Sequence, residues 1–109
     1  MTTLPGTISV RLSAQAPQVE VLTPLALVLG ARAGLSIEQI EDLAMALELL
    51  VKHQPATSRQ ARFAASEHQL EISLSDVDQE WVERRRPMLE VLVPEVTGDG
   101  GGVRLLVVS

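Results

Sequence analysis

The chain has 109 residues, of which 46% are hydrophobic and 2% aromatic, and none is cysteine. This length suits one domain with a single core, and the aliphatic content excludes an intrinsically disordered chain. Nine basic and 14 acidic residues give a net charge of −5 at pH 7. An acidic chain whose only aromatic residues are Phe63 and Trp81 does not suit general binding of nucleic acids or anionic membranes. Without cysteine, disulfides, thiolate zinc sites and thiol nucleophiles are excluded.

The ends and apolar runs of the sequence indicate where the protein works. Residues 1–6 carry neither the basic segment nor the apolar run of a signal peptide. The longest apolar segment, Leu25–Ala31, falls far short of the about 18 residues that a membrane span requires. We therefore expect a cytoplasmic protein, organised as one domain over residues 1–109.

The first third of the chain predicts a strand followed by a helix. Apolar and polar residues alternate over Thr7–Leu12, which is typical of a half-buried strand. Apolar residues then recur at helical spacing from Val19 to Ala33, and Gly34 is suited to end that helix in the left-handed conformation. Pro24 interrupts the pattern, so we expect either a kink there or a restart with Thr23 as N-cap.

The next helix has the clearest signals in the chain. Ser36 and Gln39 form the S-x-x-Q pattern of a capping box. Glu48 stands one turn before Lys52, the spacing of a helical ion pair. The helix is expected to end near His53, ahead of a proline. Its apolar stripe consists of Ile37, Ile40, Leu43, Ala44, Leu47, Leu50 and Val51.

Two antiparallel strands are expected to follow, over Gln60–Ser66 and Leu70–Ser75, with a turn near Glu67 and His68. The second strand alternates apolar and polar residues, so one of its faces is in contact with water. Phe63 supplies the inward face of the first strand. The pair therefore predicts a hairpin with one buried face.

The last third predicts a short helix and a final hairpin. Asp76–Arg86 is polar and is expected to be a loop or a loose helical turn, and Pro87 begins a short helix through about Leu92. Val93–Thr97 and Val103–Val108 form the hairpin, connected by Gly98–Gly102. The order β-α-α-β-β-α-β-β predicts an α+β fold, a two-layer α/β sandwich with helices on one face of a mainly antiparallel sheet.

Few residues outside these elements suggest chemistry. His53 and His68 show no spacing that would bring them together with a carboxylate, so they are expected to be ordinary solvated residues rather than metal ligands. The glycine run at 98–102 precedes a strand, whereas a phosphate-binding loop precedes a helix. Residues 84–86, all arginine, are either a solvated loop or a docking patch for an acidic partner. No serine–histidine–aspartate set can be assembled from the pattern.

Two stretches of the sequence resemble a known family: residues 31–48 (ARAGLSIEQIEDLAMALE) and residues 88–108 (MLEVLVPEVTGDGGGVRLLVV). Both are similar to segments of the bacterial anti-sigma-factor serine kinases, which belong to the GHKL ATPases. The order of predicted elements also agrees with that family. The resemblance implies a histidine-kinase-like ATPase fold, and in working members a site for ATP with magnesium.

Alignment on the Asp42-Leu43 pair shows where this chain departs from the family. Leu49 stands at the position of the catalytic glutamate, and Glu48 precedes that position by one residue, a rotation of about 100° on a helix. His53 stands at the position of the magnesium-binding asparagine. Asp76 matches the aspartate that reads adenine in the family.

Two glycine-rich boxes of the family are also altered. Residues 77–79 (VDQ) stand where glycines let the backbone approach the nucleotide. Residues 83–87 (ERRRP) stand where the phosphate-binding turn and lid belong, so the lid is reduced. Phosphoryl transfer depends on positioning and on charge stabilisation by the metal and by donors. The resemblance therefore implies a scaffold that has lost catalysis, with no catalytic residue and no metal site.

These inferences lead to one main hypothesis and two alternatives. The main hypothesis is a non-catalytic, anti-sigma-factor-like regulator without a cofactor, which binds a sigma factor or an anti-anti-sigma (STAS) domain. Its expected contact residues are Trp81, Arg84, Arg85 and Arg86. The first alternative is a weak ATP-binding serine kinase whose vestigial nucleotide-pocket positions are Glu48, His53 and Asp76.

The second alternative is a structural homo-oligomer, for example a homodimer, with no signalling role. The final strand favours it, because the strand is apolar on both faces. Leu106 and Val108 alternate there with Val103, Leu105 and Val107.

Overall fold

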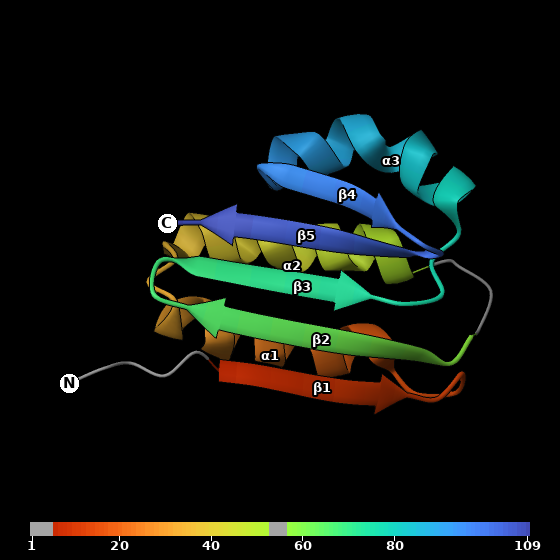
Figure 1. The fold of residues 1–109 in the computed structure, drawn as a ribbon, viewed down its shortest axis with the longest axis horizontal. Helices are drawn as coiled ribbons and strands as arrows, with labels where there is room; N and C mark the ends of the chain where they lie inside the picture. The colour runs from red at the N-terminus through yellow and green to blue at the C-terminus, as the bar shows by residue number, and fades with distance from the viewer. Residues whose placement is uncertain (1–5, 53–56) are drawn as a thin grey trace.

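The computed structural model of the chain describes residues 6–52 and 57–109. Its elements follow in the order β1 (Gly6–Leu12), α1 (Gln18–Arg32), α2 (Ile37–Val51), β2 (Arg59–Ser66), β3 (Gln69–Leu74), α3 (Gln79–Leu92), β4 (Glu95–Asp99) and β5 (Gly102–Val108). The strands form one sheet in the order β1-β2-β3-β5-β4, and every neighbouring pair is antiparallel (Figure 1). The predicted α+β class and element order are confirmed.

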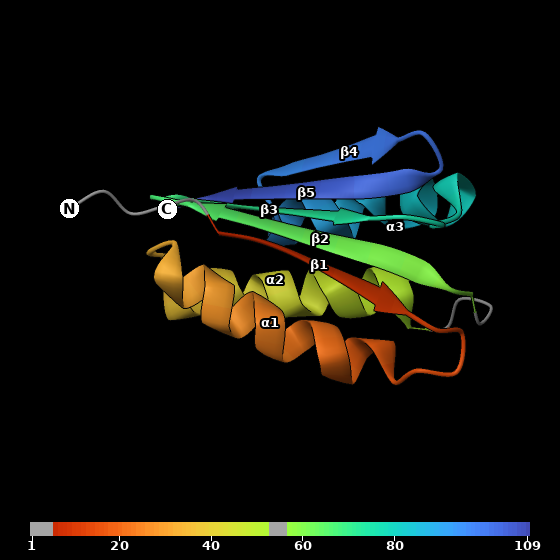
Figure 2. The ribbon, with the colours of Figure 1, turned by 60° about the horizontal axis from the view of Figure 1, so that its bottom comes forward.

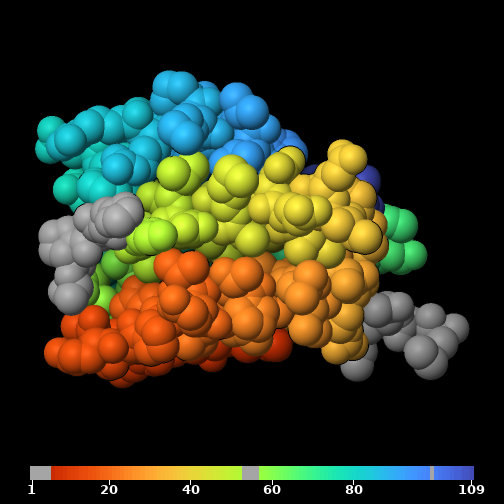
Figure 3. All heavy atoms as spheres, turned by 180° about the vertical axis from the view of Figure 1, so that it is seen from behind, coloured from red at the N-terminus to blue at the C-terminus, as the bar shows by residue number. Residues whose placement is uncertain are grey.

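The fold has two layers, with the helices gathered on one face of the sheet (Figure 2). Seen from the helical side, α1, α2 and α3 lie side by side and cover the strands (Figure 3). The other face of the sheet has no cover in the part of the chain that the structure describes. None of the described helices combines the length and apolar character that a membrane crossing would need.

α1 is one continuous helix that passes through Pro24, so the predicted restart at Thr23 is wrong. Its end follows the prediction: Gly34 has a φ of +81°, in the left-handed region that favours glycine. The N–H of Gly34 donates to the C=O of Ala31 (3.1 Å), and the N–H of Leu35 donates to that of Gly30 (3.0 Å). This pair of bonds is a Schellman motif, which satisfies two carbonyls at the helix end.

α2 begins at the predicted capping box. The N–H of Gln39 donates to Ser36 Oγ (3.1 Å), and the N–H of Ser36 donates to Gln39 Oε1 (2.9 Å). Gln39 Nε2 also donates to the C=O of Val108 (2.9 Å), which ties the start of α2 to the end of β5. The helix ends at Val51, slightly before the expected position at His53, and His53 lies outside the described residues.

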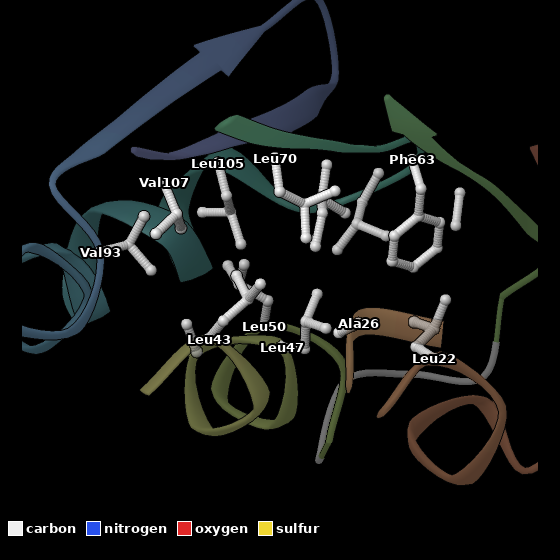
Figure 4. Packing of buried hydrophobic residues seen from close by; sticks show 14 of the residues in the cluster. Leu22, Ala26, Leu43, Leu47, Leu50, Phe63, Leu70, Val93, Leu105 and Val107 are labelled. Carbon is white, nitrogen blue, oxygen red and sulfur yellow. The ribbon is translucent and has the colours of Figure 1, made fainter. Parts of the chain in front are cut away.

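The core lies between the helices and the inner face of the sheet (Figure 4). Phe63 is fully buried there, as predicted, and leucines of α2 pack toward it and its neighbours on β3 and β5. The largest fully buried side chains are Phe63, Leu22, Leu43, Leu47, Leu50, Leu70, Ile72, Leu74, Leu89, Leu105, Val82 and Val93. Branched aliphatic residues therefore build almost the whole core.

The third helix is longer than the sequence predicted. α3 already begins at Gln79, where the N–H of Glu80 donates to Asp78 Oδ1 (2.9 Å), and Pro87 lies inside it. Of the stretch Asp76–Arg86, expected to be a loop or a loose helical turn, only Asp76–Asp78 precede the helix, and the predicted helix start at Pro87 is wrong. Val82 and Leu89, two turns apart, are both completely buried. Their packing stabilises a helix that its polar composition and its proline disfavour.

The connection of the final hairpin is tighter than predicted. β4 extends to Asp99, and Gly100 and Gly101 alone form the turn, with φ values of +52° and +91°. Two consecutive residues at positive φ define the type I′ turn, whose twist matches that of a hairpin. A strand and not a helix follows the glycine run, which confirms the predicted hairpin connection. β4 begins at Glu95, two residues later than predicted, after Pro94.

We predict that Leu47→Ala lowers the free energy of unfolding by about 2–5 kcal/mol, because it opens a cavity in the core between α2 and the sheet. Met45→Ala, on the same helix but 53% exposed, should change it by less than about 0.5 kcal/mol. Urea denaturation followed by circular dichroism measures both. Equal effects of the two variants would contradict the packing described above.

Candidate functional site

The contact between α2 and α3 occupies the region where the resemblance places nucleotide-handling residues. Trp81 Nε1–H donates to the C=O of Leu49 (3.0 Å). Leu49 lies in the last turn of α2, where carbonyls lack partners within the helix. The guanidinium carbon of Arg85 lies 3.3 Å from the centre of the Trp81 ring, a cation–π contact. We call this contact of Leu49, Trp81 and Arg85 the α2–α3 seam.

Glu48 lies at the rim of the seam and is partly exposed. Its Oε1 accepts from Lys52 Nζ at 3.0 Å, which confirms the predicted ion pair. A hollow of about 280 Å³ remains beside it, lined by Met45, Glu48, Leu49, Lys52 and Arg85. Glu48 also lines a second hollow of about 360 Å³, at the start of α1 and β2.

Asp76 lies elsewhere, directly after β3. It is exposed, has a φ of +55° and accepts from Ser75 Oγ at 3.0 Å through Oδ2. It lines two shallow hollows of about 530 and 400 Å³, neither of which includes Glu48. The structure therefore does not bring Glu48 and Asp76 into one cavity.

A buried polar pair, Arg59 and Gln18, was missed by the sequence analysis. Arg59 is only 3% exposed, and its Nε–H donates to Gln18 Oε1 (2.7 Å). Its Nη1 donates to the carbonyls of Ser75 (3.4 Å) and Asp76 (3.3 Å). Gln18 Nε2 in turn donates to the carbonyls of Ser13 and Thr57. The pair thus joins the start of α1 to the open end of the β2–β3 hairpin, where β2 begins and β3 ends.

Arg59 stands between Glu48 and Asp76. It lines the hollow of about 360 Å³ with Glu48 and the hollow of about 400 Å³ with Asp76. Burial lowers the pKa of Arg59, and the negative charge of Asp76 partly opposes this change. A signal for this residue exists in the sequence: Arg59 continues the alternation of the inward-facing residues Ala61 and Phe63 by one position.

The three consecutive arginines do not form one patch, because successive helix positions are rotated by about 100°. The Arg84 side chain is exposed, and its Nη2 lies 3.6 Å from Glu80 Oε1. Arg85 covers Trp81. Arg86 binds Glu83 at 2.9 Å, and this hydrogen bond lowers the pKa of Glu83 and raises that of Arg86.

His68 occupies the β2–β3 turn, where a solvated residue was expected. Its φ is +70°, and Nδ1 lies 3.3 Å from Ser109 Oγ. Nε2 lies 3.6 Å from the exposed carboxylate of Glu67. No group of three or more histidine, aspartate or glutamate side chains suited to a metal ion occurs within residues 6–52 and 57–109.

Comparison with known proteins relates the fold to that of solved structures. No protein-family model matches the chain, and no curated protein matches it. The crystal structure of the RsbU and RsbW domains of Rv1364c from Mycobacterium tuberculosis is similar over 94% of this chain, with a TM-score of 0.62 and 15% sequence identity. This chain covers 31% of that longer one. The likeness shows an RsbW-like GHKL fold.

We predict that Arg59→Ala lowers the free energy of unfolding by about 2–3 kcal/mol, because the buried Gln18 Oε1 and two partly buried carbonyls lose their donor. Arg62→Ala is the matched control, since Arg62 is exposed on the same strand. It should cost less than about 0.5 kcal/mol. Urea unfolding compares the two, and a similar loss for both would refute the structural role of Arg59.

We predict that Arg85→Ala shifts the fluorescence emission of Trp81, the only tryptophan, to longer wavelength, because water replaces the guanidinium over the ring. The variant should lose about 0.5–1 kcal/mol of stability. Arg84→Ala should leave the emission spectrum unchanged, since Arg84 pairs with Glu80 instead. An equal shift in both variants would mean that Arg85 does not shield Trp81.

Proposed function

We propose that the chain is a non-catalytic regulator related to the anti-sigma-factor kinases, and that it acts by binding a protein partner. The partner class is a sigma factor or a STAS-domain protein, the two classes that the sequence resemblance implies. The structural likeness to a chain that contains an RsbW anti-sigma-factor domain is consistent with this assignment. The proposed mode of action is occupation of a surface, without nucleotide chemistry.

The observation that carries the proposal is the α2–α3 seam. Trp81 hydrogen-bonds to Leu49, the residue at the position of the catalytic glutamate in the resemblance. Arg85 covers Trp81 where the phosphate-binding turn and lid would be. With these contacts, α3 packs on α2, and a hollow of only about 280 Å³ remains between the two helices. The separation of Glu48 from Asp76 further supports the loss of a shared nucleotide pocket.

The outer face of α3 is the surface that best suits a partner. Arg84, Met88 and Val91 share this face, and Met88 and Val91 are 56% and 83% exposed. Exposed apolar side chains with a charged rim are typical of interface centres. Trp81, by contrast, is half-buried in the seam, where it contacts Leu49 and Arg85. Among the predicted contact residues, Arg84 is therefore the one presented to a partner.

A second function is favoured by one observation, the open face of the sheet. Leu106 is half-buried there and Val108 is 49% exposed, and none of the described helices lies above them. This apolar pair supports the homo-oligomer hypothesis. Leu106→Arg would place a charge on this face and weaken an oligomer built on it. The substitution leaves the outer face of α3 unchanged.

Calorimetric titration with the purified sigma factors and STAS proteins of the same cell tests the main proposal. We expect saturable binding of one of them and no heat with ATP and magnesium. Val91→Asp should weaken that binding about tenfold or more, because it places a charge at the centre of the apolar surface. Leu27→Asp, a 55% exposed residue on α1, is the matched control and should bind normally.

Absence of binding to every sigma factor and STAS protein would refute the proposal. Saturable binding of ATP with magnesium that is lost in Asp76→Ala would instead support the residual kinase. If Val91→Asp and Leu27→Asp bind the partner equally well, the partner surface does not lie on the outer face of α3.

A further inference from the structure

The open face of the sheet carries a row of polar side chains that crosses all the strands. Figure 1 looks onto this face, with the strands in front of the helices. Taken in the order β1-β2-β3-β5-β4, the residues in register are Ser9, Arg62, Ser73, Arg104 and Thr97. Arg62 and Arg104 are exposed. The row therefore places an arginine on either side of Ser73.

A third arginine of the open face stands in the next row. Arg11 of β1 is exposed and lies opposite Gln60 of β2. The N–H of Gln60 donates to Ser75 Oγ (2.7 Å), which completes this row toward β3. Arg11 is therefore the diagonal neighbour of Arg62. Diagonal neighbours on a sheet lie about 7–8 Å apart, within reach of long side chains.

These three arginines lack an anionic partner in the part of the chain that the structure describes. Within residues 6–52 and 57–109, Arg11, Arg62 and Arg104 form neither an ion pair nor a side-chain hydrogen bond. Two arginines of α3, by contrast, bind glutamates. Glu71, in the row next to Arg62, is half-buried and has no ion pair in the same ranges. Like charges held near one another on a sheet face repel, so an anion between them would be stabilised.

Two hollows lie where these rows meet the end of β3. Their volumes are about 530 and 400 Å³, and they share Gln60, Ser75 and Asp76. Among the described residues, the charged ones that line the two hollows are Arg11, Arg59, Arg62 and Asp76. Three guanidinium groups and one carboxylate leave two positive charges, on a chain whose net charge is −5. The hollows are thus positive on an acidic protein.

The uncharged side chains of the larger hollow add hydrogen-bond donors. Ser9, Ser73 and the Gln60 amide line it, and none of these side chains has a hydrogen-bond partner in the described ranges. Guanidinium forks match the geometry of phosphate and carboxylate groups. A phosphate monoester carries a charge of about −1.5 to −2 at pH 7 and three strong acceptor oxygens. It therefore matches the charge and the donors of this place better than a carboxylate, which carries a single charge.

We propose that Arg11, Gln60, Arg62 and Ser73 form a binding site for a small phosphate-bearing anion, either inorganic phosphate or a phosphate monoester. We call it the outer arginine site. Arg62 is its central residue, because it lies beside Ser73 and diagonal to Arg11. The site lies on the face of the sheet opposite the α2–α3 seam, so it does not depend on the proposed function.

Calorimetric titration of the full chain with inorganic phosphate, at neutral pH and constant ionic strength, tests the outer arginine site. We expect saturable binding. Arg62→Gln should weaken it about tenfold or more, because the phosphate loses a charge-assisted hydrogen bond, with unchanged circular dichroism. Arg32→Gln is the matched control, since Arg32 is an exposed arginine of α1 that also has no ion pair within the described residues. It should bind phosphate normally.

Amide NMR spectra recorded during the titration locate the bound anion. Phosphate should shift the signals of residues 60–62 and 73–75 and leave those of α2 and α3 unchanged. Glycerol phosphate distinguishes the two forms of the ligand. Tighter binding of glycerol phosphate than of inorganic phosphate would assign a phosphate monoester, and the reverse order would assign the free anion. Acetate at the same ionic strength should not displace either one.

Absence of saturable binding of both phosphate and glycerol phosphate would overturn the outer arginine site. So would phosphate binding that persists in Arg62→Gln, or that Arg62→Gln and Arg32→Gln weaken equally. Displacement by acetate would show that the place accepts any anion and would also overturn it. Failure of these tests leaves the titrations with sigma factors and STAS proteins unaffected, because they concern the outer face of α3.

Discussion

One-sided burial of the sheet is the constraint on which the rest of the structure depends. Leucines of α2 and Phe63 of β2 fill a single aliphatic layer, and α1 and α3 flank it. An antiparallel sheet covered on one face alternates apolar and polar residues along each strand. The alternation in turn decides which side chains remain available to solvent. The two surfaces considered under the proposed function, the outer face of α3 and the open face of the sheet, lie outside this layer.

The parts of the fold that sequence patterns predict are those where local and tertiary preferences agree. Alternation over Thr7–Leu12, the capping box at Ser36 and the left-handed Gly34 each correspond to what the structure shows. α3 was mispredicted because Pro87 and the polar run before it disfavour a helix locally, whereas the burial of Val82 overrides that preference.

The candidate site was less predictable than the fold. Its decisive contacts join residues far apart in the sequence, such as Trp81 with Leu49 and Arg59 with Gln18. No periodicity specifies which side chain will reach which carbonyl. The alternation of β2 does place Arg59 inward, but inward-facing arginine is uncommon and its partners are set by tertiary packing. Sequence reasoning could therefore locate the elements of the site and not its hydrogen bonds.

The hydrogen bond that Arg86 donates to the C=O of Val96 on the β4 edge has a consequence for assembly. Among the described strands, β1 alone then presents an uncovered edge. If two sheets met at that edge, the joined sheet would have no uncovered edge left to accept a third. The same chain with β4 uncovered would form open-ended filaments. The position of α3 thus makes any edge-to-edge association self-limiting.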